Sequence, residues 1–284
     1  MYNNKILKNK DLGKMSIQGI DEEKCILCRN CIESCGRGLF SDKEQDKIIF
    51  QDPENDCSRC GHCIARCPED VVIYKEMGEA KSFEGIKNLE EIIPYNDMYN
   101  FLQAHRSVRQ YKKDKVPNEV LRKVFDAMQC APTARNMRSE SYTILSEEDQ
   151  IISLSDAIIE LISETSGIRE LYAERLARAR KLFKSPIFFD APHVIIISSK
   201  NDTESEANNI GIIVTYGRLA AQAIGLGTCW NGLTQFAMNM NRKLARTYGI
   251  RGKRVGVFTI GYPASTLTFY RTAPRSIRPV KGLD

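Results

Sequence analysis

Eight of the ten cysteines in this chain of 284 residues lie between residues 25 and 67, in two runs with the same spacing. The first run is Cys25, Cys28, Cys31 and Cys35, and the second is Cys57, Cys60, Cys63 and Cys67, which Pro68 follows. Three cysteines at intervals of three, with a fourth four residues further on, are typical of [4Fe–4S] cluster ligation by thiolates. The spacing therefore predicts iron–sulfur chemistry in this part of the chain.

Two such runs in one segment resemble a bacterial ferredoxin with two [4Fe–4S] clusters, in which the last cysteine of each run ligates the other cluster. Three closely spaced thiolates can surround one cluster in a tight turn, while the fourth comes from a distant part of the chain. The first run ends in Cys35-Gly36 instead of Cys-Pro, which bears on the environment of the cluster more than on its existence. The resemblance implies two ligand sets, which are Cys25, Cys28, Cys31 and Cys67 for one cluster and Cys57, Cys60, Cys63 and Cys35 for the other.

Zinc sites and disulfides are the alternative uses of so many cysteines. Structural zinc sites usually pair two separate hooks of cysteine or histidine, whereas each run here has three closely spaced cysteines plus one. Residues 1–5 do not lead into an apolar secretory core. We therefore expect the chain to stay in a reducing compartment, the cytoplasm, where disulfides are rare.

Composition and charge limit the classes of partner. No apolar run approaches the ~20 residues that a membrane-spanning helix needs, so we expect a soluble protein and no membrane partner. Residues 1–80 hold 12 Lys and Arg against 15 Asp and Glu, and the rest of the chain holds 29 against 21. Neither part has a basic stripe interleaved with aromatic residues, so no nucleic-acid partner is expected. A basic body suits an anionic cofactor and an acidic electron-transfer module, although scattered solvated charge explains the same numbers.

The elements around the cysteines repeat. Residues 1–15 are polar and read as a loosely held lead-in, and residues 16–20 read as a short strand. A charged turn over residues 41–46 precedes a strand at 47–50, and a strand at 71–74 follows the second run. This order of run, strand, run and strand is an internal repeat that fits a two-fold pseudo-symmetric ferredoxin fold.

Longer helices follow a charged segment that ends at Pro94. The apolar periodicity predicts helices over 117–130, 147–163, 168–183, 206–224 and 239–248, and strands at 142–145, 193–197 and 254–260. The chain is therefore expected to be an α+β protein. We expect a two-cluster, ferredoxin-like domain at residues 1–80, a linker at 81–96 and a sheet domain at 97–284.

Four segments of the second domain carry its candidate chemistry. Residues 105–111 read HRSVRQY and place cations and a hydroxyl close together, which suits a phosphate because arginine offers a rigid fork of donors. The other three segments are 131–138 (APTARNMR), 225–232 (GLGTCWNG) and 261–263 (GYP), the last followed by Arg271 and Arg275. Taken alone, the first segment reads as a surface turn, Gly225 as a helix C-cap and Cys229 as a buried small side chain.

The order and spacing of these four segments resemble the FMN-dependent nitroreductase family, over about residues 97 to 280. The resemblance implies a nitroreductase-like α+β sheet domain, an FMN cofactor and a homodimer with FMN at the subunit interface. The FMN-binding residues that it implies are His105, Arg106, Ser107, Arg109, Pro132, Thr133, Asn136, Arg138, Asn231, Gly232, and either Arg271 or Arg275.

The resemblance also implies roles for some of these residues. Asn136 would bond the isoalloxazine, the backbone N–H groups of Asn231 and Gly232 would bond flavin N5 or O4, and Arg271 or Arg275 would reach the phosphate. Two residues depart from the family pattern, since His105 replaces an arginine and Arg138 replaces a glutamine. A cation near the pyrimidine edge would favour the anionic reduced flavin, but Arg138 can equally point to solvent.

The combined segments predict an oxidoreductase in which two [4Fe–4S] clusters feed single electrons to FMN. The reduced flavin would then reduce a small electrophile such as a nitroaromatic, a quinone or an activated alkene. No catalytic side chain is expected, because the hydride leaves from the flavin itself. The donor is either an external ferredoxin or NAD(P)H. Two alternatives stay open: an electron carrier or redox-responsive binding module without its own substrate, and clusters that serve only as structural staples.

Overall fold

A computed structural model of the chain describes residues 16–42, 47–83, 85–86, 88–264, 269–276 and 278–282. It divides into two compact units. The first comprises the chain up to residue 87 together with Arg135–Met137, and the second comprises the remainder. The lead-in expected at 1–15 and most of the turn expected at 41–46 lie outside the described residues. The domain boundaries expected from the sequence stay a prediction.

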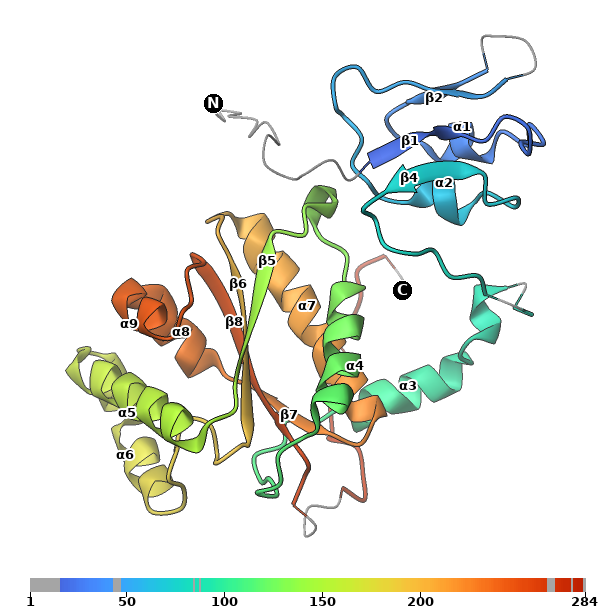
Figure 1. Ribbon diagram of the computed structural model, residues 1–284. Coiled ribbons are helices and arrows are strands. Elements are labelled where there is room, and N and C mark those ends of the chain that lie inside the picture. The colour runs from blue at the N-terminus through green and yellow to red at the C-terminus, as the bar shows by residue number, and fades with distance from the viewer. Residues whose placement is uncertain are drawn as a thin grey trace. The chain divides into compact units, whose positions relative to one another are not determined.

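The first unit contains four short strands and two short helices. They are β1 (Ser16–Ile20), α1 (Asn30–Ser34), β2 (Phe40–Ser41), β3 (Ile49–Phe50), α2 (His62–Ala65) and β4 (Val72–Lys75). β1 pairs antiparallel with β4, and β2 pairs antiparallel with β3, in two separate two-stranded sheets (Figure 1). The expected strands at 16–20, 47–50 and 71–74 thus exist within a few residues, and β2 is the strand that the sequence did not indicate.

The hydrophobic core of the first unit is small. Its buried aliphatic and aromatic residues include Ile17, Phe40, Ile48, Ile64 and Val72, which pack against buried Cys31 and Cys63. The rings of Phe40 and Phe50 lie 5.0 Å apart between centroids. A domain this small buries too little apolar surface to be stable by packing alone, and small domains commonly depend on bound metal.

The second unit is built on a four-stranded antiparallel sheet of order β5-β6-β8-β7. The strands are β5 (Glu140–Leu145), β6 (His193–Ser199), β7 (Gly227–Trp230) and β8 (Arg254–Gly261). The helices are α3 (Tyr95–Ala104), α4 (Asn118–Gln129), α5 (Glu148–Glu164), α6 (Ile168–Arg180), α7 (Glu204–Ala223), α8 (Gly232–Met240) and α9 (Arg242–Thr247). Short 3-10 helices cover Leu89–Glu91 and Ala134–Asn136.

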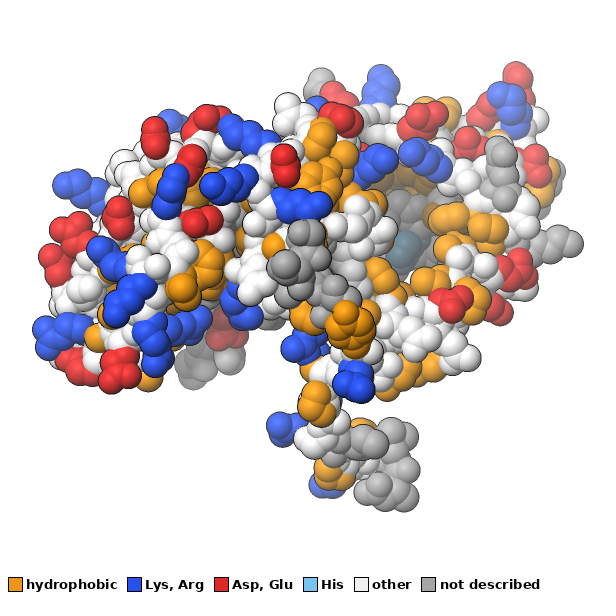
Figure 2. Space-filling view, turned by 90° about the horizontal axis from the view of Figure 1, so that it is seen from below, with side chains coloured by type: hydrophobic (Ala, Val, Ile, Leu, Met, Phe, Trp, Pro, Cys, Tyr) orange, Lys and Arg blue, Asp and Glu red, His pale blue; other side chains and the backbone are white. Residues whose placement is uncertain are grey.

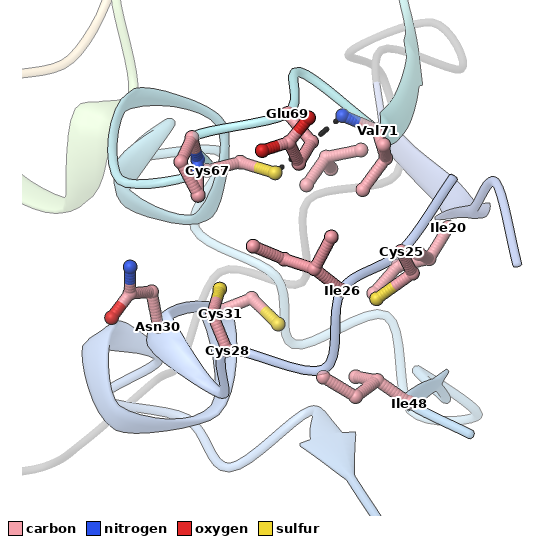
Figure 3. A pocket seen from close by; sticks show the side chains of 12 residues that line it. Ile20, Cys25, Ile26, Cys28, Asn30, Cys31, Ile48, Cys67, Glu69 and Val71 are labelled. Atoms are coloured by element: carbon pink, nitrogen blue, oxygen red, sulfur yellow. Dashed lines mark hydrogen bonds between the residues drawn. The ribbon is translucent and has the colours of Figure 1, made fainter. Parts of the chain in front are cut away.

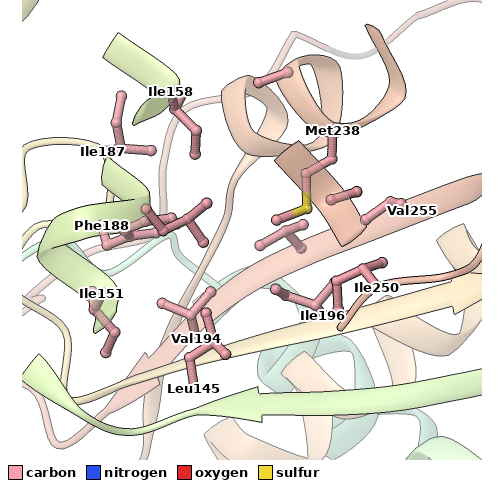
Figure 4. Close-up of a cluster of buried hydrophobic side chains, with 14 of the residues drawn as sticks. Leu145, Ile151, Ile158, Ile187, Phe188, Val194, Ile196, Met238, Ile250 and Val255 are labelled. Carbon is pink, nitrogen blue, oxygen red and sulfur yellow. The ribbon is translucent and has the colours of Figure 1, made fainter. Parts of the chain in front are cut away.

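Helices cover both faces of this sheet. Helices α4 and α7 cover one face (Figure 1). Ile195 and Ile197 of β6 and Phe258 of β8 pack there with buried residues of these two helices. Val194 and Ile196 point to the opposite face, where they meet α5, α8 and α9 (Figure 4). Successive strand residues face opposite sides, so a central strand between two helical layers must be apolar at every position. This explains the continuous apolar run that predicted a buried strand at 193–197.

Most helices lie within a few residues of their predicted positions. The helix expected over 239–248 is wrong in its boundaries: α8 ends at Met240, and Asn241 caps α9 by accepting a hydrogen bond from the N–H of Leu244 at 3.0 Å. α3, β7 and most of α8 were not expected. Gly225 follows α7 with φ of 78°, and the N–H of Leu226 donates to the carbonyl of Ala221 at 2.8 Å, which confirms the predicted C-cap.

The surface of the second unit mixes charges. At the left of Figure 2, on the side where α5 and α6 lie in Figure 1, Lys and Arg side chains are interspersed with Asp and Glu and with hydrophobic side chains. Most residues of α6, which lies within the helix expected at 168–183, are exposed, including Arg175, Arg178 and Arg180. None of the helices in the described ranges is long and apolar enough to cross a membrane.

Candidate cofactor-binding sites

Four cysteines line one pocket in the first unit. They are Cys25, Cys28, Cys31 and Cys67, and their neighbours are mostly apolar residues such as Ile20, Ile26, Ile48 and Val72. Figure 3 shows these side chains around the hollow, with Ile26 between Cys25 and Cys31. The pocket therefore brings together the cysteine set that the ferredoxin resemblance assigns to one cluster.

The other four cysteines of the two runs line a second pocket. Cys35 from the first run meets Cys57, Cys60 and Cys63 from the second, beside Ile17 and Leu39. All ten cysteines of the chain have free thiols. Among the described residues, no three His, Cys, Asp or Glu side chains converge closely enough to hold a single metal ion. The crossed grouping of the eight cysteines fits two clusters, and ligation itself stays a prediction.

Residues on either side of the second cysteine of each run adopt unusual backbone conformations. Leu27 and Arg29 flank Cys28 with φ of 57° and 65°, and Arg59 and Gly61 flank Cys60 with φ of 56° and 74°. Positive φ is strained for residues other than glycine, and such strain gathers at functional sites. The same winding at equivalent positions of both runs indicates that the loops are shaped to surround a ligand.

Backbone donors and burial also mark the thiols as ligands. The Sγ atom of Cys35 accepts from the N–H of Leu39 at 3.4 Å, and that of Cys67 accepts from Val71 at 3.5 Å. Hydrogen bonds to cluster sulfurs tune the reduction potential. Burial raises the pKa of the Cys63 thiol to about 11 and raises the pKa of Cys31 and of Cys57. Buried thiols of this kind ionise when a metal supplies positive charge, so the residues present fit an iron–sulfur cluster.

The second unit holds a basic pocket of about 420 Å³. Its lining is His105, Arg106, Ser107, Arg109, Arg218 and Arg275, without an acidic residue. The Arg218 side chain donates to Ser107 Oγ at 3.4 Å and to Thr228 Oγ1 at 3.3 Å. Clustered guanidinium groups and a hydroxyl suit a phosphate, so this anion pocket fits the phosphate end of FMN.

The structure refines the set of basic residues expected there. Arg275, and not Arg271, lines the anion pocket among the described residues. Arg218 was missed, because no motif marks it and only the fold brings helix α7 to Ser107. His105 Nδ1 lies 2.6 Å from Gln222 Oε1, and Gln222 in turn donates to the carbonyl of Phe101 at 2.8 Å. Burial lowers the pKa of His105, the hydrogen bond to Gln222 opposes this shift, and Arg218 and Arg275 lower the pKa further. The net shift favours the neutral imidazole.

The segment that carries Ser107 is fixed against β7. The N–H of Val108 donates to the carbonyl of Thr228 at 2.9 Å. The Tyr111 hydroxyl donates to the carbonyl of Val108 at 2.7 Å and lies 2.8 Å from Thr259 Oγ1, and burial raises the pKa of Tyr111. A Cβ on Gly227 would lie 2.7 Å from Val108 Cγ1, so glycine is needed where the two segments meet.

Hydrogen bonds between backbone groups and side chains hold the 131–138 segment. The N–H of Ala134 donates to Asn209 Oδ1 at 2.9 Å, and Thr133 Oγ1 accepts from the N–H of Arg138 at 3.2 Å. Pro132 and Arg138 are exposed, and the Arg138 side chain donates to the carbonyl of Gln129 at 3.1 Å. Of the two positions considered for Arg138, this favours the one in which the side chain points to solvent. Within the first unit, to which Arg135–Met137 belong, Asn136 Nδ2 donates to the carbonyl of Arg59 at 2.6 Å. Flavin contacts of Pro132, Thr133, Asn136 and Arg138 stay predictions.

Asn231 and Gly232 begin helix α8. The N–H of Asn231 donates to the carbonyl of Val257 at 2.8 Å, and its side chain accepts from the N–H of Thr234 at 3.0 Å. The backbone N–H of Asn231 already has a partner in the protein, so of the two backbone N–H groups that of Gly232 is the better candidate donor to a flavin. Cys229 is buried, which confirms the prediction of a small buried side chain at this position.

A larger cavity of about 520 Å³ adjoins Asn231 and Gly232 and contains Cys229 and Trp230 in its lining. Arg109 lines both this cavity and the anion pocket. A basic pocket next to a partly apolar cavity, with one shared arginine, fits a cofactor that has a phosphate at one end and a planar ring at the other.

Two family matches cover most of the chain. Residues 102–262 match the nitroreductase family, and residues 24–72 match a 4Fe-4S dicluster domain. An uncharacterised ferredoxin of Methanocaldococcus jannaschii is 33% identical over 67 residues, which are 23% of this chain and 86% of that protein. A nitroreductase of Mycolicibacterium smegmatis is 25% identical over 164 residues, 48% of this chain and 70% of the relative. The chain spans only 8% of a probable oxidoreductase of Bacillus subtilis, to which it is 31% identical over 80 residues.

Solved structures support the fold of the second unit. A nitroreductase with bound FMN from Bacteroides fragilis aligns with a TM-score of 0.55 and 18% identity, over 66% of this chain and all of the other. A nitroreductase with bound FMN from Desulfitobacterium hafniense aligns with a TM-score of 0.53 and 15% identity, over 64% of this chain and 97% of the other. The α+β class and the nitroreductase-like sheet domain expected from the sequence are thereby confirmed.

Proposed function

Since the chain belongs to the nitroreductase family and also carries a 4Fe-4S dicluster domain, we propose that it is an iron–sulfur flavin oxidoreductase in which two [4Fe–4S] clusters and one FMN form an electron relay. The observation that carries the proposal is the presence, in one chain, of two four-cysteine pockets and an anion pocket beside a larger cavity. Cluster cysteines with N–H donors and burial suit electron transfer as well as structure.

The residues of the anion pocket would hold the FMN phosphate. Arg106, Arg218 and Arg275 supply positive charge and Ser107 supplies a hydroxyl. His105 donates from Nδ1 to Gln222 Oε1, so in the neutral ring Nε2 can only accept a hydrogen bond. Asn231 caps the start of α8, and Gly232, the next residue, lines the adjoining cavity, where its N–H would bond the flavin. The relatives with bound FMN support this assignment by fold.

Bound FMN would supply two-electron chemistry to a small electrophile, with the clusters delivering the electrons one at a time. The chain's own residues bind and orient; none is proposed as a nucleophile or general base. A nitroaromatic, a quinone or an activated alkene is the proposed class of acceptor. The alternative hypothesis, an electron carrier without its own substrate, predicts a cofactor face that is closed to small molecules, whereas the enzyme requires a face that an acceptor can reach.

Assembly and compartment complete the proposal. Because FMN lies at a subunit interface in the family that the sequence resembles, we propose a homodimer. Because [4Fe–4S] thiolates need a reducing compartment, we propose the cytoplasm. A monomeric FMN-loaded protein in light scattering would contradict the dimer.

The donor is tested by parallel assays. NADH, NADPH and a reduced ferredoxin are each offered, without oxygen, to the wild-type protein and to Cys25→Ala with a quinone as the acceptor. The relay predicts that ferredoxin-driven turnover is lost in Cys25→Ala, because the first cluster then lacks a ligand. Equal turnover with NADH before and after the substitution, together with none from ferredoxin in either protein, would contradict the relay.

A further inference from the structure

Helix α6 forms one wall of the larger cavity and places an arginine in its apolar stripe. Ile168, Leu171, Tyr172, Leu176 and Ala179 recur at helical spacing along this wall. Arg175 occupies the same stripe, at a position where another apolar residue would complete the pattern. The Arg175 side chain is exposed to solvent, so its charged head group can stay hydrated while its stem lies along the apolar stripe. In this position the guanidinium group is accessible to an anionic ligand that enters the cavity.

No carboxylate of the chain neutralises Arg175 among the described residues. The ion pairs among the described residues of the second unit include neither Arg175 nor Arg109. Of the acidic residues on α6, Glu170 accepts from the N–H of Gly167 at 2.6 Å and from Arg169 at 2.9 Å. Glu174 lies outside the cavity lining, which contains two arginines and no Asp or Glu.

The opposite wall presents an aromatic ring on a constrained loop. Phe189 and Asp190 both have positive φ, at 59° and 52°, a costly conformation for two successive non-glycine residues. The Asp190 carboxylate fixes the loop by accepting from the N–H groups of Ser185 at 2.7 Å and Lys184 at 3.2 Å. The loop thereby holds the Phe189 ring at the cavity, with the guanidinium carbon of Arg109 5.7 Å from its centroid.

Aromatic side chains and unpaired positive charge thus meet in one cavity. Tyr172, Phe189, Trp230 and Phe236 offer ring surfaces for a planar molecule. Arg109 is already engaged over Phe189 and shared with the anion pocket, so Arg175 is the cation available to a second ligand. We infer that this cavity selects a planar aromatic electron acceptor with a carboxylate, and that Arg175 is the residue that binds the carboxylate.

This inference rests on the proposed function, since it names the acceptor class of the same site. A suitable acceptor is a nitrobenzoate. Its nitro group takes two electrons and two protons, breaks one N–O bond, releases water and becomes a nitroso group. The reduced protein supplies the electrons, and the solvent supplies the protons.

The test compares 4-nitrobenzoate with 4-nitrobenzamide, which has the same shape and no charge. The cofactor-loaded full chain is reduced with dithionite, a chemical donor that bypasses the natural one, and is mixed without oxygen with each acceptor. The concentration that half-saturates the rate of flavin re-oxidation should be at least about tenfold lower for the benzoate, because a hydrogen bond to a charged group discriminates by roughly that factor. Arg175→Gln should bring the ratio close to one.

Arg178→Gln is the matched control, because Arg175 and Arg178 are both exposed on the same helix and only Arg175 lines the cavity. It should keep the wild-type ratio. Re-oxidation by neither acceptor would contradict the proposed function. Equal half-saturating concentrations for the two acceptors in the wild-type protein would overturn this inference and leave the proposed function standing. A preference for the benzoate that persists in Arg175→Gln would have the same meaning.

Discussion

At the level of single residues, Cys28 shows how the backbone prepares a thiol for a metal. Strained residues precede and follow it, and its pocket gathers three further cysteines. A serine hydroxyl binds iron far more weakly than a thiolate does. We predict that Cys28→Ser loses about four of about eight irons per chain, as four belong to each cluster.

Iron and sulfide analysis of anaerobically purified protein measures this loss. Cys130→Ser is the control, because Cys130 is exposed and lines neither cysteine pocket. Full iron content in both variants would rule out Cys28 as a ligand.

The anion pocket allows a second test at single residues, between two arginines that follow β8. Arg275 lines the pocket and Arg271 does not. Arg275→Gln should weaken FMN binding by about tenfold or more, because a charge-assisted hydrogen bond to phosphate contributes roughly 1.5–3 kcal/mol. Arg271→Gln should change the affinity by less than about twofold, as expected for an exposed cation. FMN fluorescence titration compares the two, and a larger loss in Arg271→Gln would exchange their roles.

Residue-level prediction from the sequence worked where chemistry fixes the spacing. Cluster ligands must lie at set intervals, so the two cysteine sets could be grouped before the structure placed them in two pockets. Arg218 could not be found, because it is 111 positions from Ser107 and carries no local signal. The positive φ of Leu27 and Arg59 also had no signal, since both residue types usually avoid that conformation.

At the level of elements, helix α7 packs against α4 through a glycine. A Cβ on Gly217 would lie 2.6 Å from Met128 Cγ in the buried core, whereas a Cβ on Gly211, on the same helix, would meet nothing within 4 Å. Gly217→Ala should destabilise the protein by about 1–3 kcal/mol through overpacking. Gly211→Ala should stabilise it by up to about 1 kcal/mol, because alanine favours a helix.

Thermal unfolding followed by the fluorescence of Trp230, the single tryptophan of the chain, reports on this unit. Equal shifts in the two glycine variants would show that Met128 adapts freely and that Gly217 is not needed for the packing of α4 on α7.

His193, the first residue of β6, gives the fold a pH dependence. Its Nε2 accepts from the N–H of Val116 at 2.9 Å, and its Nδ1 lies 2.8 Å from Ser146 Oγ. Burial lowers the pKa of His193, and Lys115 lowers it further. Below a pH of about 6.5 the unfolded chain binds a proton at His193 more readily than the native state does. The free energy of unfolding is therefore largest above this pH and falls as the pH drops below it.

The unfolding midpoint reported by Trp230 should fall as the pH drops below about 6.5, and His193→Gln should flatten this fall. His62→Gln should keep it, because His62 is exposed. An unchanged slope in His193→Gln would assign the pH dependence to other groups.

Element prediction succeeded for long periodic segments and failed for short ones. α5 and β6 carry clear helical or continuous apolar patterns, and the structure has them where the sequence indicated. β2 has two residues and β7 has four, which are too few to show a period. The break between α8 and α9 depends on the side-chain cap of Asn241, a contact that apolar periodicity does not report.

At the level of the whole molecule, the chain combines an acidic cysteine-rich part with a basic part that holds the anion pocket. Family matches cover both, and the charge difference between them was visible from composition. Composition alone could not identify the larger cavity, because its lining includes residues of α6, of the loop before β6 and of the start of α8. Only the folded sheet brings these segments together.

The central claim is that clusters and flavin work as one relay, and one anaerobic measurement tests it. The purified protein is analysed for iron, sulfide and FMN, and its visible spectrum is then followed while reduced ferredoxin is added. The account predicts about eight irons and one FMN per chain, with bleaching of the flavin band in the wild-type protein and none in Cys28→Ser. Iron without flavin, or flavin that bleaches equally in Cys28→Ser, would contradict it.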